Sequence, residues 1–180
     1  WIETIAITDT IKPFTDADFQ FSVPQDFSAI GDYNVTAIVS QVDDGYGNND
    51  TLNVVLSKVH ALDGEISIGE LEVVCNDVVE IIAIVKNQGE TTITEVAIEV
   101  IVNGLVVDLI NATVDVPFQE QDKVEITINN NLQQSNNNIT LNLLSINNQA
   151  DGDLTNNSTS AITDLDTDYD IITLIINPDN

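Results

Sequence analysis

The chain repeats part of its own sequence. Residues 31–38 and 43–51 resemble residues 139–146 and 151–159, and a weaker match upstream pairs residues 12–23 with residues 116–128. A spacing of about 105 residues is too long for a solenoid repeat and fits a β-sandwich module. The counterparts of residues 66–102 would precede Trp1, so we expect the first module to lack its opening strands.

Apolar and polar residues alternate along much of the chain, as is typical of strands with one solvated face. Phe19, Phe21 and Val23 follow this pattern, and so do residues 52–56 and 94–102. The Asn103-Gly104 pair between two apolar runs predicts a type I′ hairpin turn. We expect strands at residues 68–75, 78–86, 93–102, 105–111, 122–128, 138–148 and 156–163.

Seven antiparallel strands in about 95 residues match the size of an immunoglobulin-like sandwich. The sequence therefore predicts an all-β chain of tandem immunoglobulin-like antiparallel β-sandwich modules. Residues 1–62 would be the C-terminal part of one module, 66–163 a complete module, and 164–180 a linker and the first strand of a following module. In the complete module we expect five buried side chains, namely Ile81, Ile98, Val100, Ile126 and Leu141.

The charge balance restricts the partners. Thirty Asp and Glu residues face four lysines and no arginine, which gives a formal charge of −26. Phosphates of nucleic acids and anionic membrane surfaces need Lys and Arg, so neither is an expected partner. No apolar run is long enough to insert into a membrane. The acid excess fits either simple solubility or binding of divalent cations.

Turn motifs carry a resemblance to a known family. They are Ile84-Val85-Lys86-Asn87-Gln88-Gly89, the Val102-Asn103-Gly104 hairpin, and Asp151 with Asn156-Asn157 before the last strand. With these motifs, residues 66–163 resemble the CARDB domain, a cell-adhesion-related domain found in bacteria. The Asn/Asp-rich, Arg-free composition resembles that of large secreted surface proteins of Bacteroidetes. The resemblance implies an extracellular or cell-surface location and a spacer or adhesive role.

The sequence offers little for catalysis. His60 is the single histidine, and Ser57, three residues before it, would lie on the opposite face of a strand. No nucleophile elbow, zinc motif or phosphate-binding glycine loop is present. We therefore expect no enzymatic activity within this chain.

Two acidic loops are candidate calcium sites. The first offers Asp43, Asp44, Asn48 and Asp50, and the second offers Asp151, Asp153 and Thr155. Oxygen ligands at alternate positions around a tight turn are suited to Ca²⁺, although neither loop is an EF-hand. The alternative is that Asp, Asn and Gly simply form the hairpin turns.

Two threonines are candidate glycosylation sites. Thr10 and Thr51 each follow an aspartate and precede an apolar residue. This pattern resembles the O-glycan acceptor of Bacteroidetes, and the alternative is that both are unmodified surface threonines.

Three functions remain open. The first is a structural or adhesive repeat module of an extracellular multi-domain surface protein, stalk or filament. Its partners would be neighbouring modules of the same chain or filament, surface glycans, or other cells. The second is an accessory β-sandwich region of a large secreted hydrolase. The third, a carbohydrate-binding module, is disfavoured because the aromatic residues Trp1, Tyr33, Tyr46 and Tyr169 are scattered.

Overall fold

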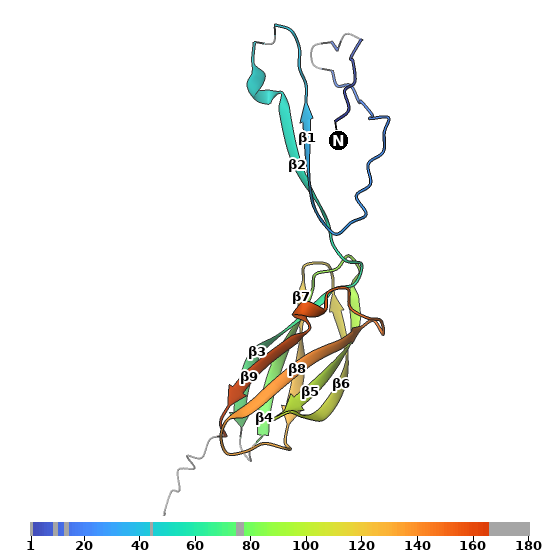
Figure 1. Ribbon diagram of the computed structural model, residues 1–180. Coiled ribbons are helices and arrows are strands. Elements are labelled where there is room, and N and C mark those ends of the chain that lie inside the picture. Colours follow the sequence, from blue (N-terminus) through green and yellow to red (C-terminus); the bar gives the residue numbers. More distant parts are fainter. Residues whose placement is uncertain (1, 9–10, 13–14, 44, 75–77, 166–180) are drawn as a thin grey trace, which may run out of the picture. The chain divides into compact units, whose positions relative to one another are not determined.

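The computed structural model describes residues 2–8, 11–12, 15–43, 45–74 and 78–165 of the 180-residue chain. The chain divides into two compact units, an N-terminal unit (Trp1–Lys58) and a C-terminal unit (Val59–Asn180). Strands dominate the described residues, which contain two short 3-10 helices and no α-helix (Figure 1). The predicted all-β class is confirmed.

Seven antiparallel strands build the C-terminal unit, as the sequence predicts. One sheet has the order β3-β4-β7 and the other the order β6-β5-β8-β9 (Figure 1). Thus β6 stays beside β5, whereas β7 crosses over to pair with β4. The strands are β3 (Gly64–Val74), β4 (Val78–Asn87), β5 (Ile93–Val102), β6 (Leu105–Val116), β7 (Gln121–Ile128), β8 (Asn137–Ile146) and β9 (Ser158–Thr163).

The alternation in the sequence explains which face each strand buries. Along β5 the even positions from Val96 to Val102 are buried, as expected for a period of two. The strand β4 is apolar on both faces and lies in the centre of its sheet. Asn103 and Gly104 have φ values of 52° and 82°, so the predicted turn with two positive φ angles joins β5 to β6.

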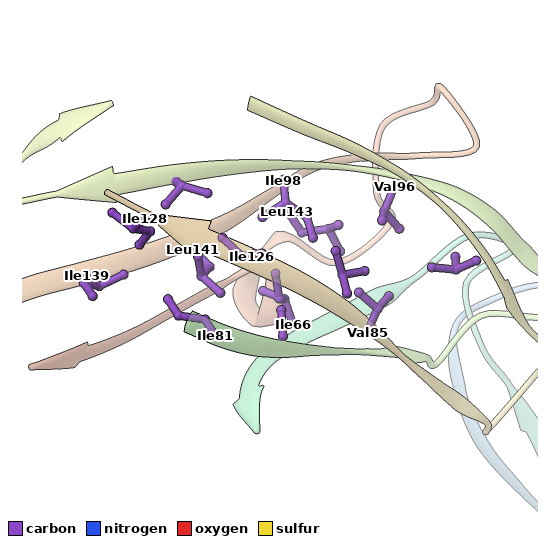
Figure 2. Packing of buried hydrophobic residues seen from close by; sticks show 14 of the residues in the cluster. Ile66, Ile81, Val85, Val96, Ile98, Ile126, Ile128, Ile139, Leu141 and Leu143 are labelled. Atoms are coloured by element: carbon purple, nitrogen blue, oxygen red, sulfur yellow. The ribbon is translucent and has the colours of Figure 1, made fainter. Parts of the chain in front are cut away.

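The core lies between the two sheets of the C-terminal unit (Figure 2). It is made mainly of branched aliphatic side chains, each of which contributes about 1.5–3 kcal/mol when fully buried. The five residues expected in the core are all at most 2% exposed, which confirms that prediction.

A β-bulge bends strand β3. The pairing with β4 shifts between Ile68 and Glu70, and Gly69 lies at the irregularity. A Cβ atom on Gly69 would lie 2.8 Å from Cγ1 of Ile84, so the close approach of the two strands there favours glycine, and a larger residue would displace the Ile84 side chain.

The N-terminal unit contains one hairpin. Strand β1 (Gly31–Ile38) pairs antiparallel with β2 (Thr51–Lys58), and the 3-10 helix η1 (Gly47–Asn49) lies between them. The C-terminal unit has the same order in β8, the 3-10 helix η2 (Leu154–Asn156) and β9.

The strand pattern at Phe19, Phe21 and Val23 was misleading, because residues 15–30 contain no strand. A strand persists only when a neighbour pairs with its backbone groups. Residues 124–128, which match this segment in sequence, belong to β7 and pair with β4. The described residues of the N-terminal unit form only β1 and β2, so residues 19–23 have no strand like β4 to pair with there.

Two strands of the C-terminal unit extend by four or more residues beyond a predicted end. The first, β3, begins at Gly64 because Gly64 already pairs with Asn87, and β6 continues to Val116 opposite Ile93. The first strand of a following module, expected within residues 164–180, lies outside the described residues, which end at 165.

Candidate functional site

Asp151, in the second candidate calcium loop, is a buried carboxylate. Its Oδ2 accepts a hydrogen bond from the backbone N–H of Gly64 at 3.0 Å, and its Oδ1 accepts one from Asp153 N–H at 3.1 Å. Burial raises the pKa of Asp151, and the nearby Asp63 carboxylate acts in the same direction, while the hydrogen bonds oppose it. This carboxylate therefore connects the loop to the start of β3.

Asp153 caps the 3-10 helix η2. Its Oδ1 accepts hydrogen bonds from the backbone N–H of Thr155 at 2.9 Å and from the Thr155 hydroxyl at 2.7 Å. Both hydrogen bonds lower the pKa of Asp153, and the bond from the Thr155 hydroxyl has the larger effect. A Ser, Thr or Asp side chain that bonds locally in this way is a common turn device.

The same loop contacts residues 60–63, which we call the junction segment. The Asp63 side chain is buried, and its Oδ1 accepts a hydrogen bond from Asn156 Nδ2 at 2.9 Å. Gly152 lies so close to the segment that a Cβ atom there would be 2.6 Å from the Leu62 carbonyl oxygen and 2.7 Å from the His60 ring.

The first candidate calcium loop has a different local structure. Asp43 is exposed with a φ of 68°, Asn48 lies within η1, and Asp50 follows that helix, whereas Asp44 lies outside the described residues. No side chain caps η1, so the loop lacks the bond that Asp153 makes in the second copy.

The described residues of the two loops form no cluster of metal-ligating side chains. Within the described part of the chain, no three His, Cys, Asp or Glu side chains are grouped so that they could hold a metal ion. Ca²⁺ takes six to eight oxygen ligands, but the Asp151 and Asp153 oxygens already accept hydrogen bonds from the protein. Calcium binding at these loops stays a prediction.

The other residues singled out in the sequence have separate local surroundings where the structure describes them. Thr51 opens β2 and is exposed, and Thr10 lies outside the described residues, so glycosylation stays a prediction. The Ser57 hydroxyl donates a hydrogen bond to Asp32 at 2.6 Å. His60 lies against Gly152.

Sequence reasoning missed two fully buried asparagines. Asn87 Nδ2 donates to the carbonyl oxygens of Thr91 and Val116 at 2.9 and 2.8 Å, and its Oδ1 accepts from Gly89 N–H at 2.9 Å. Asn137 bonds both backbone groups of Gln133 in the preceding loop. The Asn87-Gln88-Gly89 motif was noted only as a turn, although its Asn also bridges to β6.

Among the described residues, every buried side-chain nitrogen or oxygen has a hydrogen-bond partner. No helix in this part of the chain is long and apolar enough to cross a membrane. The buried polar side chains described above therefore stabilise the loops by hydrogen bonds to backbone groups.

Comparison with known proteins gives the following result. No protein-family model and no curated protein matches the sequence. The chain is similar to a crystal structure of the CARDB domain of a Pyrococcus furiosus protein in complex with di-metal ions. The two share 19% identity over 61% of this chain and 97% of that domain, with a TM-score of 0.49.

Two solution structures are similar as well. One is of the same Pyrococcus domain, with 20% identity over 59% of this chain and 97% of that one, and a TM-score of 0.46. The other is a domain of a protein named as a cell surface protein in Methanosarcina acetivorans. It shares 22% identity over 61% of this chain and 95% of that one, with a TM-score of 0.48.

Proposed function

We propose that this chain is a non-catalytic structural or adhesive repeat module of an extracellular multi-domain surface protein, stalk or filament. The observation that carries the proposal is that the C-terminal unit fastens its chain both where it enters and where it leaves the sandwich. A spacer in a stalk must transmit tension through these two points without unravelling.

At the start of the unit, all four backbone carbonyls of the junction segment accept hydrogen bonds. His60 and Ala61 accept from Glu90 and Thr91 at 3.0 and 2.9 Å, and Leu62 accepts from Gly152 at 2.9 Å. Asp63 accepts from Gln88 at 2.8 Å and from Gly89 at 3.1 Å. Two separate loops thus hold the incoming chain before β3 begins.

At the other end, the chain is fastened again after β9. Leu165 is buried, and its N–H donates to the Gln134 carbonyl at 3.2 Å. The Asp164 carboxylate accepts a hydrogen bond from Asn136 N–H at 2.5 Å. A stretching force applied to the two ends of the C-terminal unit would therefore act first on these loop contacts and then on the strands β3 and β9.

The charge is compatible with this role outside cells. A net charge of −26 keeps neighbouring modules apart and soluble, and it disfavours binding to nucleic acid. The partners of such a module are its neighbours in the same chain or filament, and its exposed loops would be the surfaces that contact glycans or other cells.

The location is tested on intact cells that make the protein. We expect antibodies raised against the C-terminal unit to label unpermeabilised cells, and brief protease treatment of those cells to remove the label. A periplasmic or cytoplasmic marker protein that stays intact is the control for lysis. Labelling that requires permeabilisation would contradict the proposal.

A further inference from the structure

The hairpin of the N-terminal unit has one apolar and one polar face. Residues opposite each other in an antiparallel pair share a face. The mainly polar face carries hydrogen bonds from Ser57 to Asp32 and from Thr36 to Asn53, and it also carries the exposed Ile38 and Val55. The other face, which we call the apolar face, carries three pairs, Tyr33 with Leu56, Val35 with Val54, and Ala37 with Leu52.

Much of the apolar face is open to solvent. Leu52, Val54 and Leu56 are 62%, 41% and 43% exposed, and Phe19 and Phe21 of the same unit are each 49% exposed. Full burial of one such side chain contributes about 1.5–3 kcal/mol. A two-stranded hairpin by itself is only marginally stable in water, so this face needs a covering layer.

The second copy of the hairpin shows what such a layer looks like. In the C-terminal unit, the core-facing side of β8 and β9 carries Ile139 opposite Ala161 and Leu141 opposite Thr159, in a pairing register that differs from that of β1 with β2. Strand β3 lies against both strands, and Ile139 and Leu141 are fully buried. The covering strand is paired in turn with β4, and both present aliphatic side chains to the core.

We propose that the apolar face of β1 and β2 is an interaction surface for the β3-like and β4-like strands of a segment of the β3–β6 type, whose β5-like strand would pair with the edge of β1. Such a segment has antiparallel strands with branched aliphatic side chains on one face, and it is joined to the chain ahead of the hairpin. In the C-terminal unit the covering strands also precede their hairpin in sequence.

Charge disfavours a second copy of the chain as the occupant, because each copy carries −26 and the copies repel. A covalently joined segment is already at high effective concentration and avoids this cost of association. The inference does not depend on the proposed role of the protein outside cells.

The test is a fusion in which a second copy of residues 59–115 is placed ahead of Lys12. This joint follows the match between residues 12–14 and residues 116–118. Hydrogen exchange of the β1 and β2 amides and binding of an apolar dye are compared in the fusion and in the chain itself. We expect exchange to slow by about 100-fold or more in the fusion, and dye fluorescence to fall several-fold.

A matched pair of variants in the added copy tests the geometry. Ile66→Asp places a charge on the buried face of the added β3 and should abolish the slowing, whereas Ser67→Asp, on its exposed face, should preserve it. A second fusion carries Phe19→Val and Phe21→Ile, which reproduce Val124 and Ile126 of the C-terminal unit and remove any mismatch in size.

Two results would overturn the proposal. The first is unchanged exchange in both fusions. The second is slow exchange of β1 and β2 and no dye binding in the chain without any addition. If the chain without the addition then sediments as a dimer, a second copy of the chain covers the apolar face. If it sediments as a monomer, another part of the same chain covers that face.

Discussion

At the scale of single residues, asparagine has a larger structural role than its place in turns suggests. Asn87 and Asn137 are fully buried, and each donates and accepts hydrogen bonds with loop backbone groups. A side-chain amide offers both donors and an acceptor, so one residue can satisfy several buried backbone groups at once. These two side chains hold loops that carry few apolar residues of their own.

Asn87→Ala should destabilise the C-terminal unit by about 2–4 kcal/mol, because it removes the Asn87 donor from the carbonyl groups of Thr91 and Val116, while Gly89 N–H keeps only its bond to the Asp63 carbonyl. The exposed Asn138→Ala is the matched control and should change the free energy of unfolding by less than about 0.5 kcal/mol. Urea denaturation measures both values. Equal stabilities of the two variants would contradict the role of Asn87.

The pKa shifts of Asp151 and Asp153 have opposite signs and give opposite pH dependences. The raised pKa of Asp151 means that its contribution to stability is fully present below the unfolded pKa of about 3.9 and is lost as pH rises through the folded pKa. The lowered pKa of Asp153 means that its contribution is present above about 3.9 and is lost as pH falls through the folded pKa.

Comparison with Asp151→Asn and Asp153→Asn isolates these contributions. As pH falls from 7 towards 3, the stability of the wild type should rise relative to Asp151→Asn and fall relative to Asp153→Asn. The measurement is urea denaturation at several pH values. If the stability difference between wild type and variant changed with pH in the same direction for Asp151→Asn and Asp153→Asn, the opposite pKa shifts would be contradicted.

At the scale of elements, the alternation of apolar residues predicted the seven strands of the C-terminal unit and its core. The type I′ turn followed from Asn103-Gly104 because few other pairs accept two positive φ angles. The local pattern failed at Phe19, Phe21 and Val23, because a strand depends on a partner that alternation does not reveal. Contacts between distant loops, such as Asp151 with Gly64, were also invisible to local patterns.

Gly152→Ala should cost about 2 kcal/mol or more, because the new Cβ would meet the Leu62 backbone at 2.6 Å and the His60 ring at 2.7 Å. Gly69→Ala should cost less, since its nearest neighbour is the Ile84 side chain, which can shift. Thermal unfolding ranks the two variants. A larger loss at Gly69 would contradict the close packing of the second loop on the junction segment.

The calcium site predicted from the sequence implies a measurable gain in stability. A site with a dissociation constant of about 10⁻⁴ M would add about 1–2 kcal/mol at millimolar calcium, or several degrees in the melting temperature. The comparison is calcium chloride against sodium chloride at equal ionic strength, with Asp151→Ala and Asp153→Ala as controls. Equal melting temperatures in both salts would leave the loops as hydrogen-bonded turns.

At the scale of the whole molecule, the two units differ in how completely they bury their apolar residues. The C-terminal unit is a closed sandwich whose core residues are almost fully buried, whereas the hairpin of the N-terminal unit leaves its apolar face open. In the C-terminal unit β3 lies against β8 and β9, whereas the described part of the N-terminal unit contains only the strands β1 and β2. The fold of a complete module was more predictable than any specific ligand.

The proposed spacer role requires the C-terminal unit to withstand tension, because its chain is fastened at both ends. Stretching single molecules of the full chain by its termini tests this claim most directly. We expect the C-terminal unit to unfold in one step with a gain in length of roughly 300–350 Å, the extension of about 100 residues. Gly152→Ala should lower the unfolding force. Gradual extension without a discrete step, or a step unaffected by this variant, would contradict the account.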